Sequence, residues 1–190
     1  MTNENFMRFI PTKFKDAYLI EPKVFEDDRG FFMESYSKKV FAEQGIAADF
    51  VQDNHSLSVK KGVLRGLHFQ KPPHAQAKLV RVTRGKVYDV IVDIRKDSGT
   101  FGIWEGFELS AENKKMLFIP RGFAHAFLTL EDNTEFQYKC DELYHPESDS
   151  GIIWNDPDIN VKWPLRGEPI LSKRDLASPT LGKSEKYFSI

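Results

Sequence analysis

The stretch Gly62-Val63-Leu64-Arg65-Gly66-Leu67-His68-Phe69-Gln70 decides which fold and which site this sequence predicts. It is a short apolar strand that carries an arginine, a histidine and a glutamine among glycines. Glycine inside a strand marks a bulge or a close approach of the backbone. Because an ordinary buried strand rarely holds a cation and an imidazole, the stretch predicts the wall of a pocket. The alternative is an exposed strand with an incidental histidine.

The composition predicts a globular protein of one domain. The chain has 190 residues and 41% hydrophobic content, enough for a real core. A net charge of −1 argues against a nucleic-acid partner. The sequence has no apolar run long enough for a transmembrane helix, and the polar N-terminus lacks the apolar segment of a secretion signal. The single Cys140 cannot form an intrachain disulfide, which favours the cytoplasm, and its spacing from Tyr138 predicts buried packing.

Extended segments and turn signals alternate through most of the chain. This pattern, with little helix, predicts an all-β sandwich or barrel in one domain over residues 1–190, with about 15 N-terminal and about 10 C-terminal residues at its periphery. Residues 1–30 show little periodicity. Strands are expected at 31–36, 50–59, 62–70, 78–84, 87–94, 103–109, 116–119, 123–130 and 134–140.

Few helices are expected. Ser37 is a candidate N-cap for a helix over residues 38–44, which Gly45 would end. Residues 171–177 predict a turn or a single helical turn. Trp154, Trp163 and two prolines predict an ordered wrap of the chain rather than a linker.

Two segments resemble the paired motifs of the cupin family: residues 62–85 and Pro120-Arg121-Gly122-Phe123-Ala124-His125. Metal-binding cupins carry His-x-His and a Glu in the first motif and one more His in the second. Here the position two after His68 is Gln70 rather than His, and no Glu lies between His68 and Gly85. Only His68, His125 and, on a proline-rich loop, His74 are left as ligands, so a cup without a metal is predicted.

The ionisable residues in these segments suit proton abstraction beside a carbonyl. Histidine is a base near neutral pH, tyrosine can donate a proton, and lysine or arginine can stabilise a developing enolate. An aspartate behind the histidine would fix its tautomer. Each residue also has a structural explanation, such as solvation of a lysine or packing of His125 between two phenylalanines. The candidate set is His68, Lys78, Arg65, His125, Tyr138 and Asp175.

Eight segments in order resemble the dTDP-4-dehydrorhamnose 3,5-epimerase family, and the matches run from about Arg29 to Asp175. Each is short, but their joint order and spacing are specific, and the predicted catalytic positions show no departure. They are Arg29-Gly30-Phe31-Phe32, Gln52-Asp53-Asn54-His55-Ser56, Arg65-Gly66-Leu67-His68-Phe69-Gln70, Ala77-Lys78-Leu79-Val80-Arg81-Val82, Val92-Asp93-Ile94-Arg95, Ile119-Pro120-Arg121-Gly122-Phe123-Ala124-His125, Phe136-Gln137-Tyr138-Lys139 and Ile153-Trp154-Asn155-Asp156-Pro157.

The resemblance implies a cupin jelly roll, a homodimer and no metal or redox cofactor. It implies inversion at C3 and C5 of dTDP-4-dehydro-6-deoxy-D-glucose, giving dTDP-4-dehydro-L-rhamnose. His68 would be the base, paired with Asp175, and Tyr138 the acid, with Lys78 and Arg65 near the 4-keto oxygen. His125 would be a further site residue. Contacts to the nucleotide, some made from the partner subunit, would come from Arg29, Phe32, Glu34, Gln52 and Asn54.

One geometric difficulty yields a prediction. In a regular strand Arg65 and His68 face opposite sides. For both to reach one pocket, Gly66 must carry a bulge or a strong twist.

Three other functions stay open at this point. The first is a single-site epimerase or keto-isomerase acting on a related nucleotide 4-keto sugar. The second is a metal-dependent cupin enzyme. The third is a non-catalytic module that binds a sugar nucleotide.

Overall fold

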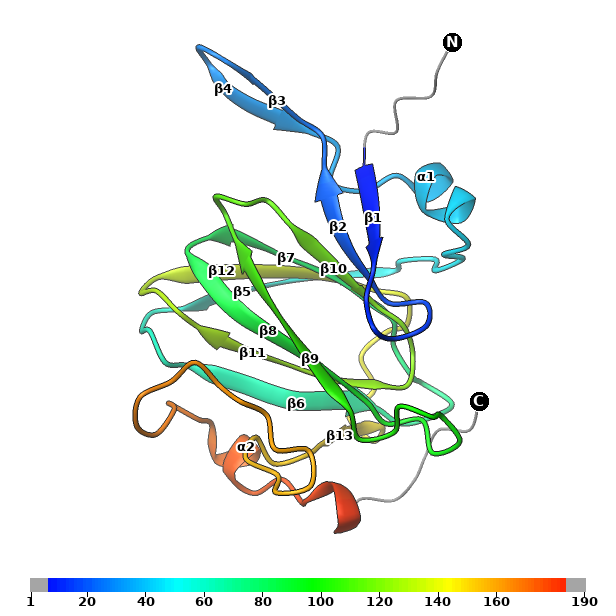
Figure 1. Ribbon diagram of the computed structural model, residues 1–190, viewed down its shortest axis with the longest axis vertical. Coiled ribbons are helices and arrows are strands. Elements are labelled where there is room, and N and C mark those ends of the chain that lie inside the picture. Colours follow the sequence, from blue (N-terminus) through cyan, green and yellow to red (C-terminus); the bar gives the residue numbers. More distant parts are fainter. Residues whose placement is uncertain (1–6, 184–190) are drawn as a thin grey trace.

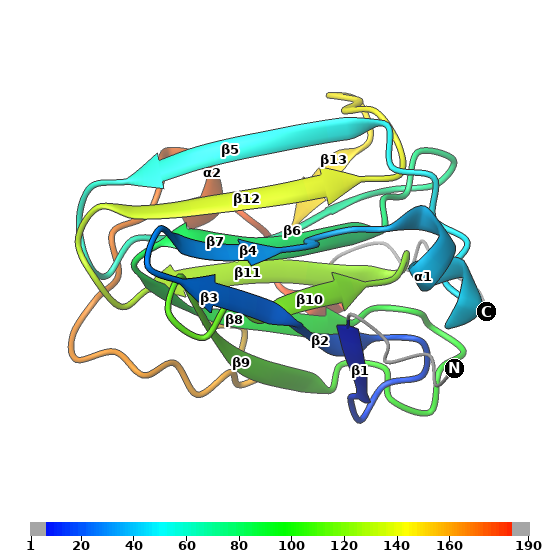
Figure 2. The same ribbon diagram turned by 90° about the horizontal axis from the view of Figure 1, so that it is seen from above.

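Two antiparallel β-sheets face each other in the computed structural model, which describes residues 7–183 (Figures 1 and 2). The six-stranded sheet has the order β1 (Met7–Pro11), β2 (Tyr18–Pro22), β10 (Met116–Ile119), β7 (Lys78–Arg84), β12 (Thr134–Cys140) and β5 (Gln52–Ser58). The five-stranded sheet has the order β13 (Asp149–Gly151), β6 (Leu64–Gln70), β11 (Phe123–Thr129), β8 (Lys86–Asp93) and β9 (Trp104–Ser110). The all-β, cupin-type prediction is confirmed.

The main core lies between the sheets and comes from the alternation along the strands. Inward side chains of β7, β8, β11 and β12 form one buried cluster, because successive residues of a strand point to opposite faces. Its members include Val80, Val87, Ile91, Phe127 and Phe136.

Each sheet also has a covered outer face. Helix α1 (Lys38–Glu43) places Phe41 in a buried cluster with Ile20 and Met116 of the six-stranded sheet. The C-terminal segment covers the five-stranded sheet through Ile152 and Ile159. The indole Nε1 of Trp163 in this segment donates to the carbonyl of Trp154 at 3.0 Å, so the predicted ordered wrap is confirmed.

The sequence predictions fail mainly before residue 38. No strands were expected in residues 1–30, yet β1, β2 and β3 (Val24–Asp27) lie there, and β4 (Gly30–Met33) ends three residues before the expected limit. The Ser37 side chain makes no capping hydrogen bond, although Ser37 occupies the N-cap of α1. Strands β1 and β2 belong to the six-stranded sheet, so residues 7–15 are not peripheral. The same expectation for residues 1–6 and 184–190 lies outside the described residues.

The hairpin of β3 and β4 projects away from the two sheets (Figure 1). At the other end of the molecule, α2 (Lys173–Leu176) and a 3₁₀ turn, Leu181–Lys183, lie in the C-terminal segment. The predicted helical turn over residues 171–177 is therefore confirmed. No helix in the described part of the chain is long and apolar enough to cross a membrane.

Strand β6 carries the predicted bulge. His68 pairs with His125, but Arg65 pairs with Phe127, so the register shifts by one residue between these pairs. Gly66 within this step has φ +128°, and a Cβ there would lie 2.4 Å from the Cβ of Ala126. Only glycine fits such a backbone so close to β11. The bulge changes which side of the sheet Arg65 faces.

Candidate active site

A cup opens between the two sheets, with walls from β6, β7, β11 and β12 and a rim from the segment around α2. Its two lobes have volumes of about 550 and 370 Å³. His68, Lys78 and Tyr138 line both lobes. The first lobe adds Arg65, His125 and Asp175, and the second adds Gln52 and Asn54. The fold therefore brings together eight of the eleven predicted site residues, all except Arg29, Phe32 and Glu34.

His68 is held by a carboxylate from the C-terminal segment. Its Nε2 lies 2.5 Å from Oδ1 of Asp175, and Ser172 donates to the other carboxylate oxygen at 2.7 Å. Asp175 is 3% exposed, and its own N–H donates to the Ser172 side chain. Burial opposes ionisation, but the hydrogen bonds from His68 and Ser172 outweigh it and lower the pKa of Asp175. An ionised carboxylate only accepts, so Nε2 of His68 carries a proton and Nδ1 keeps its lone pair.

Lys78 and Tyr138 lie side by side, with the ammonium 6.0 Å from the centre of the phenol ring. Burial lowers the pKa of Lys78, opposed in part by Cys140 and Asp149. Burial also raises the pKa of Tyr138, so its hydroxyl keeps its proton at neutral pH. The same environment raises the pKa of Cys140 to about 11, and the thiol is buried, as predicted.

His125 is bound to an aspartate that the sequence analysis missed. Its Nε2 lies 3.0 Å from both carboxylate oxygens of Asp89, and Asp89 is 0% exposed. The signal was present, because Asp89 alternates with the buried apolar residues Val87 and Ile91 along β8. Since one partner is a carboxylate, His125 donates from Nε2, and it has a fixed ring orientation rather than loose packing between phenylalanines.

The bulge brings Arg65 to the same cup as His68. Its guanidinium donates to the Ser58 hydroxyl at 3.3 Å and to the carbonyl of Leu57 at 3.4 Å. Because β5 supplies both acceptors, the cation is anchored to the sheet opposite its own strand. The predicted bulge at Gly66 is thus confirmed, and so is its consequence that Arg65 and His68 line one pocket.

The second lobe presents neutral amides. Gln52 donates to Asn54 at 3.1 Å and accepts from the backbone of Tyr144 at 2.9 Å. Arg174, which the sequence analysis also missed, lines both lobes and forms an ion pair with Asp149 at 2.6 Å. A cation at the mouth and amides within suit an anionic, polar ligand.

Arg29, Phe32 and Glu34 lie away from the cup of their own chain. Arg29 and Phe32 are on the projecting hairpin, where the Arg29 side chain is 90% exposed and forms an ion pair with Asp27. Phe32 is 69% exposed. Glu34 follows β4, and one of its carboxylate oxygens is buried without a hydrogen-bond partner.

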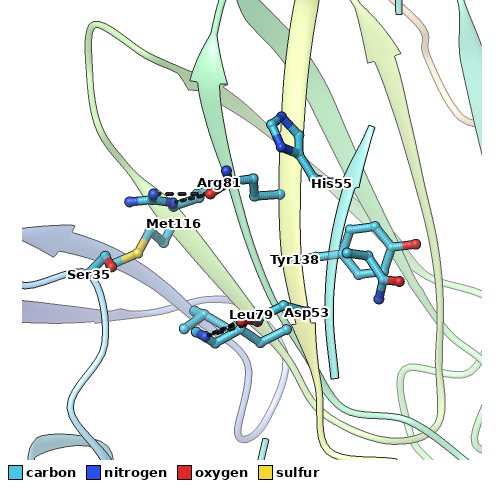
Figure 3. Close-up of a pocket in the computed structure, with 10 residues that line it drawn as sticks. Ser35, Asp53, His55, Leu79, Arg81, Met116 and Tyr138 are labelled. Carbon is cyan, nitrogen blue, oxygen red and sulfur yellow. Dashed lines mark hydrogen bonds and ion pairs between the residues drawn. The ribbon is translucent and has the colours of Figure 1, made fainter. Parts of the chain in front are cut away.

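A second hollow lies on the outer face of the six-stranded sheet. It has a volume of about 250 Å³ and is lined by Ser35, Asp53, Arg81 and Met116 among others. Figure 3 shows that the ring of Tyr138 points away from these side chains, so the hollow is separate from the cup. Its charged residues are already paired within the sheet, Arg81 with Gln137 and Lys139 with Asp53.

The structure does not bring together His68, His74 and His125, the three possible metal ligands of the cupin-like segments. Among residues 7–183, His68 and His125 belong to no group of three ligating side chains, and His74 lies with other partners. The prediction that the cup works without a metal stays a prediction.

The family model for dTDP-4-dehydrorhamnose 3,5-epimerase matches residues 11–183 of this sequence. The chain belongs to the dTDP-4-dehydrorhamnose 3,5-epimerase family. The predicted family, fold and isomerase class are therefore confirmed.

Individual members of this family are similar over nearly the whole chain. The dTDP-4-dehydrorhamnose 3,5-epimerase of Methanothermobacter thermautotrophicus is 55% identical, over 88% of this chain and 91% of its own. The dTDP-6-deoxy-D-glucose-3,5-epimerase of Legionella pneumophila, solved in complex with dTDP-4-keto-L-rhamnose, is 46% identical, with a TM-score of 0.93 and coverage of 97% and 98%. ChmJ, a 3'-monoepimerase of Streptomyces bikiniensis solved with dTDP-quinovose, is 36% identical, with a TM-score of 0.85 and coverage of 90% and 87%.

Proposed function

We propose that this chain inverts C3 and C5 of dTDP-4-dehydro-6-deoxy-D-glucose through an enolate, forming dTDP-4-dehydro-L-rhamnose. The observation that carries the proposal is the His68–Asp175 pair, which lines one cup together with the protonated phenol of Tyr138. Both inverted carbons flank the 4-keto group. One enolate oxygen can therefore serve both steps, and one base with one acid suffices.

In the first half of each inversion, Nδ1 of His68 takes the proton from the carbon beside the carbonyl. Asp175 accepts from Nε2 and stabilises the imidazolium that forms. The electron pair moves onto the 4-keto oxygen. The Lys78 ammonium and the Arg65 guanidinium, which line the cup, stabilise the negative charge that develops on that oxygen.

In the second half, Tyr138 returns a proton to the same carbon from the opposite face of the ring. Its raised pKa keeps it protonated until the enolate withdraws the proton. His125, fixed by Asp89, offers a further hydrogen bond to the sugar. The amides of Gln52 and Asn54 suit the nucleotide part.

Incubation in deuterium oxide tests the base. We expect His68→Ala to abolish uptake of deuterium at C3 and C5, whereas His55→Ala, which removes an exposed histidine paired with Glu135, serves as the matched control. Unchanged exchange in His68→Ala refutes the role of His68. NMR of the product separates the second candidate, a single-site epimerase, which the likeness to a monoepimerase keeps open: deuterium at one carbon only would favour it.

We also infer a homodimer in which each hairpin serves the cup of the other subunit. Three phenylalanines of the hairpin, Phe25, Phe31 and Phe32, are exposed, and the Arg29 side chain is 90% exposed. Leu57 on the edge strand β5 is a further exposed apolar side chain. Such an apolar surface rimmed by charge suits burial in an interface. Sedimentation velocity tests the state, and we propose the cytoplasm as the compartment on the basis of the unpaired Cys140.

A further inference from the structure

A cluster of two histidines and a glutamate lies outside the cup. The ligating atoms of His74, Glu142 and His145 all lie within 4.8 Å of one another, and the three side chains are half-buried. None of the three is among the residues that line the cup. The proposed epimerisation therefore leaves the cluster unused.

Two glutamine side chains, the buried Gln70 and the half-buried Gln76, hold the loops that carry these residues. Gln70 Nε2 donates to the carbonyl of His74 at 2.7 Å, while its Oε1 accepts from the backbone of His145 at 2.7 Å. Gln76 donates to the carbonyl of Glu142 at 2.8 Å. Gln70 is 3% exposed and belongs to β6, so both loops are tied to the rigid sheet. The three ligands are brought together before any ion arrives.

The hydrogen bond that His145 makes through Nδ1 leaves its Nε2 free to bind a metal ion. His145 Nδ1 lies 3.1 Å from Oε1 of Glu147, so its N–H donates a hydrogen bond to this carboxylate and Nε2 keeps the lone pair. That Nε2 lies 3.8 Å from Oε1 of Glu142, too far for a hydrogen bond but suitable for two ligands of one ion. In metal sites, a ligating histidine usually donates its other ring N–H to a carboxylate or a carbonyl, which fixes the tautomer and the orientation of the ring.

We propose that His74, Glu142 and His145 bind one divalent transition-metal ion, with Zn²⁺ as the best fit. Two imidazoles and a carboxylate form a ligand set that Zn²⁺ takes in proteins, with a fourth position left for water. Magnesium and calcium prefer oxygen ligands and do not suit two imidazoles.

Binding requires one movement. The rings of His74 and His145 are stacked, with centres 3.5 Å apart and planes 11° from parallel. A ring nitrogen's lone pair lies in the plane of its ring, so two parallel stacked rings cannot both point at one ion. One ring must turn about its Cβ–Cγ bond, which changes the stacking without moving the anchored backbone.

Calorimetric titration of the full chain with ZnCl₂ tests the site. We expect one ion per chain, with affinity that falls from pH 7 to pH 6 because the imidazoles must be neutral. Loss of a direct ligand in His145→Gln should weaken binding more than about 100-fold, whereas Glu147→Gln, which removes only the supporting carboxylate, should weaken it about 10- to 100-fold. MgCl₂ should give no comparable binding.

His55→Gln is the matched control, because it also removes an imidazole beside a glutamate but lies on β5. We expect it to bind Zn²⁺ as the unmodified chain does. The proposal is overturned if His145→Gln binds Zn²⁺ unchanged, if His55→Gln loses as much affinity, or if Mg²⁺ binds equally well. Substitution with Co²⁺ gives an independent readout, since a tetrahedral site shows visible absorption bands that His145→Gln should lack.

Discussion

His68 and Asp175 are 107 residues apart in the chain, yet Nε2 of one lies 2.5 Å from a carboxylate oxygen of the other. The first belongs to β6 and the second to α2, which the C-terminal segment carries back to the cup. The contact fixes the histidine tautomer, so the base is Nδ1. It also makes the packing of the C-terminal segment against β6 a condition for an active base.

Asp175→Asn should reduce the rate about 10²- to 10⁴-fold. An amide can donate to Nε2, which would place the proton on Nδ1 and remove the base. The capping hydrogen bond from the Asp175 backbone to Ser172 remains possible, so α2 should still form. Deuterium uptake at C3 and C5 measures the effect, and a rate within twofold of the unmodified chain would contradict the assigned tautomer.

The same substitution has a pH signature in stability. Because the pKa of Asp175 is lower in the folded state, its ionised form stabilises the protein above the unfolded-state pKa. That contribution disappears as the pH falls through the lowered folded-state pKa. We therefore expect Asp175→Asn to lower the free energy of unfolding at pH 6 and the difference to shrink below pH 4. Urea unfolding at both pH values measures it.

Lys78→Met should inactivate the protein and stabilise it. The ammonium stabilises the enolate, and removing such a group costs about 10²- to 10³-fold in rate. In the unliganded protein, burial of this charge is unfavourable, as its lowered pKa shows. Methionine removes that cost. The gain in melting temperature should shrink as the pH rises through the lowered pKa of Lys78, because burial does not penalise the neutral amine. A loss of stability at pH 7 would contradict the argument.

Tyr138→Phe separates abstraction of a proton from inversion. The base is untouched, so exchange of deuterium with the substrate should continue. Without a donor on the opposite face, formation of the inverted product should fall by about 10²- to 10⁴-fold. NMR of the sugar protons follows both events in one sample. Equal loss of exchange and inversion would place Tyr138 in proton abstraction instead.

The alternation of apolar and polar residues predicted most of the strands, but it did not predict the N-terminal strands. Strand β2 pairs with β1 on one side and with β10, almost a hundred residues away, on the other, and these partners rather than local periodicity make it a strand. The bulge at Gly66 was predictable because two cup residues lay at an odd spacing.

The pairing of His68 with Asp175 came only from the family resemblance, since no local pattern joins β6 to α2. Asp89 was missed because β-branched residues dominate its strand and drew attention to packing, and His74 meets His145 only through two loops.

Gly66→Ala should destabilise the protein by about 2–4 kcal/mol, combining overpacking with an unfavourable backbone conformation. The added Cβ would lie 2.4 Å from the Ala126 side chain and 2.6 Å from the backbone of β11. Gly99→Ala is the control, because nothing lies within 4 Å of its Cβ position and its φ is ordinary. Its stability should change by less than about 0.5 kcal/mol. Equal effects of the two substitutions in urea unfolding would show that β6 tolerates a regular register.

Mixed dimers test whether the hairpin serves the other subunit. A chain with His68→Ala lacks the base, and a chain with Arg29→Ala and Phe32→Ala lacks the exposed hairpin contacts, so each homodimer should be poorly active. In a mixed dimer one cup carries both defects and the other carries none, provided that the hairpin crosses between subunits. Random mixing should then restore about a quarter of the normal activity. If each hairpin served its own cup, every cup would keep one defect, and mixing would restore nothing.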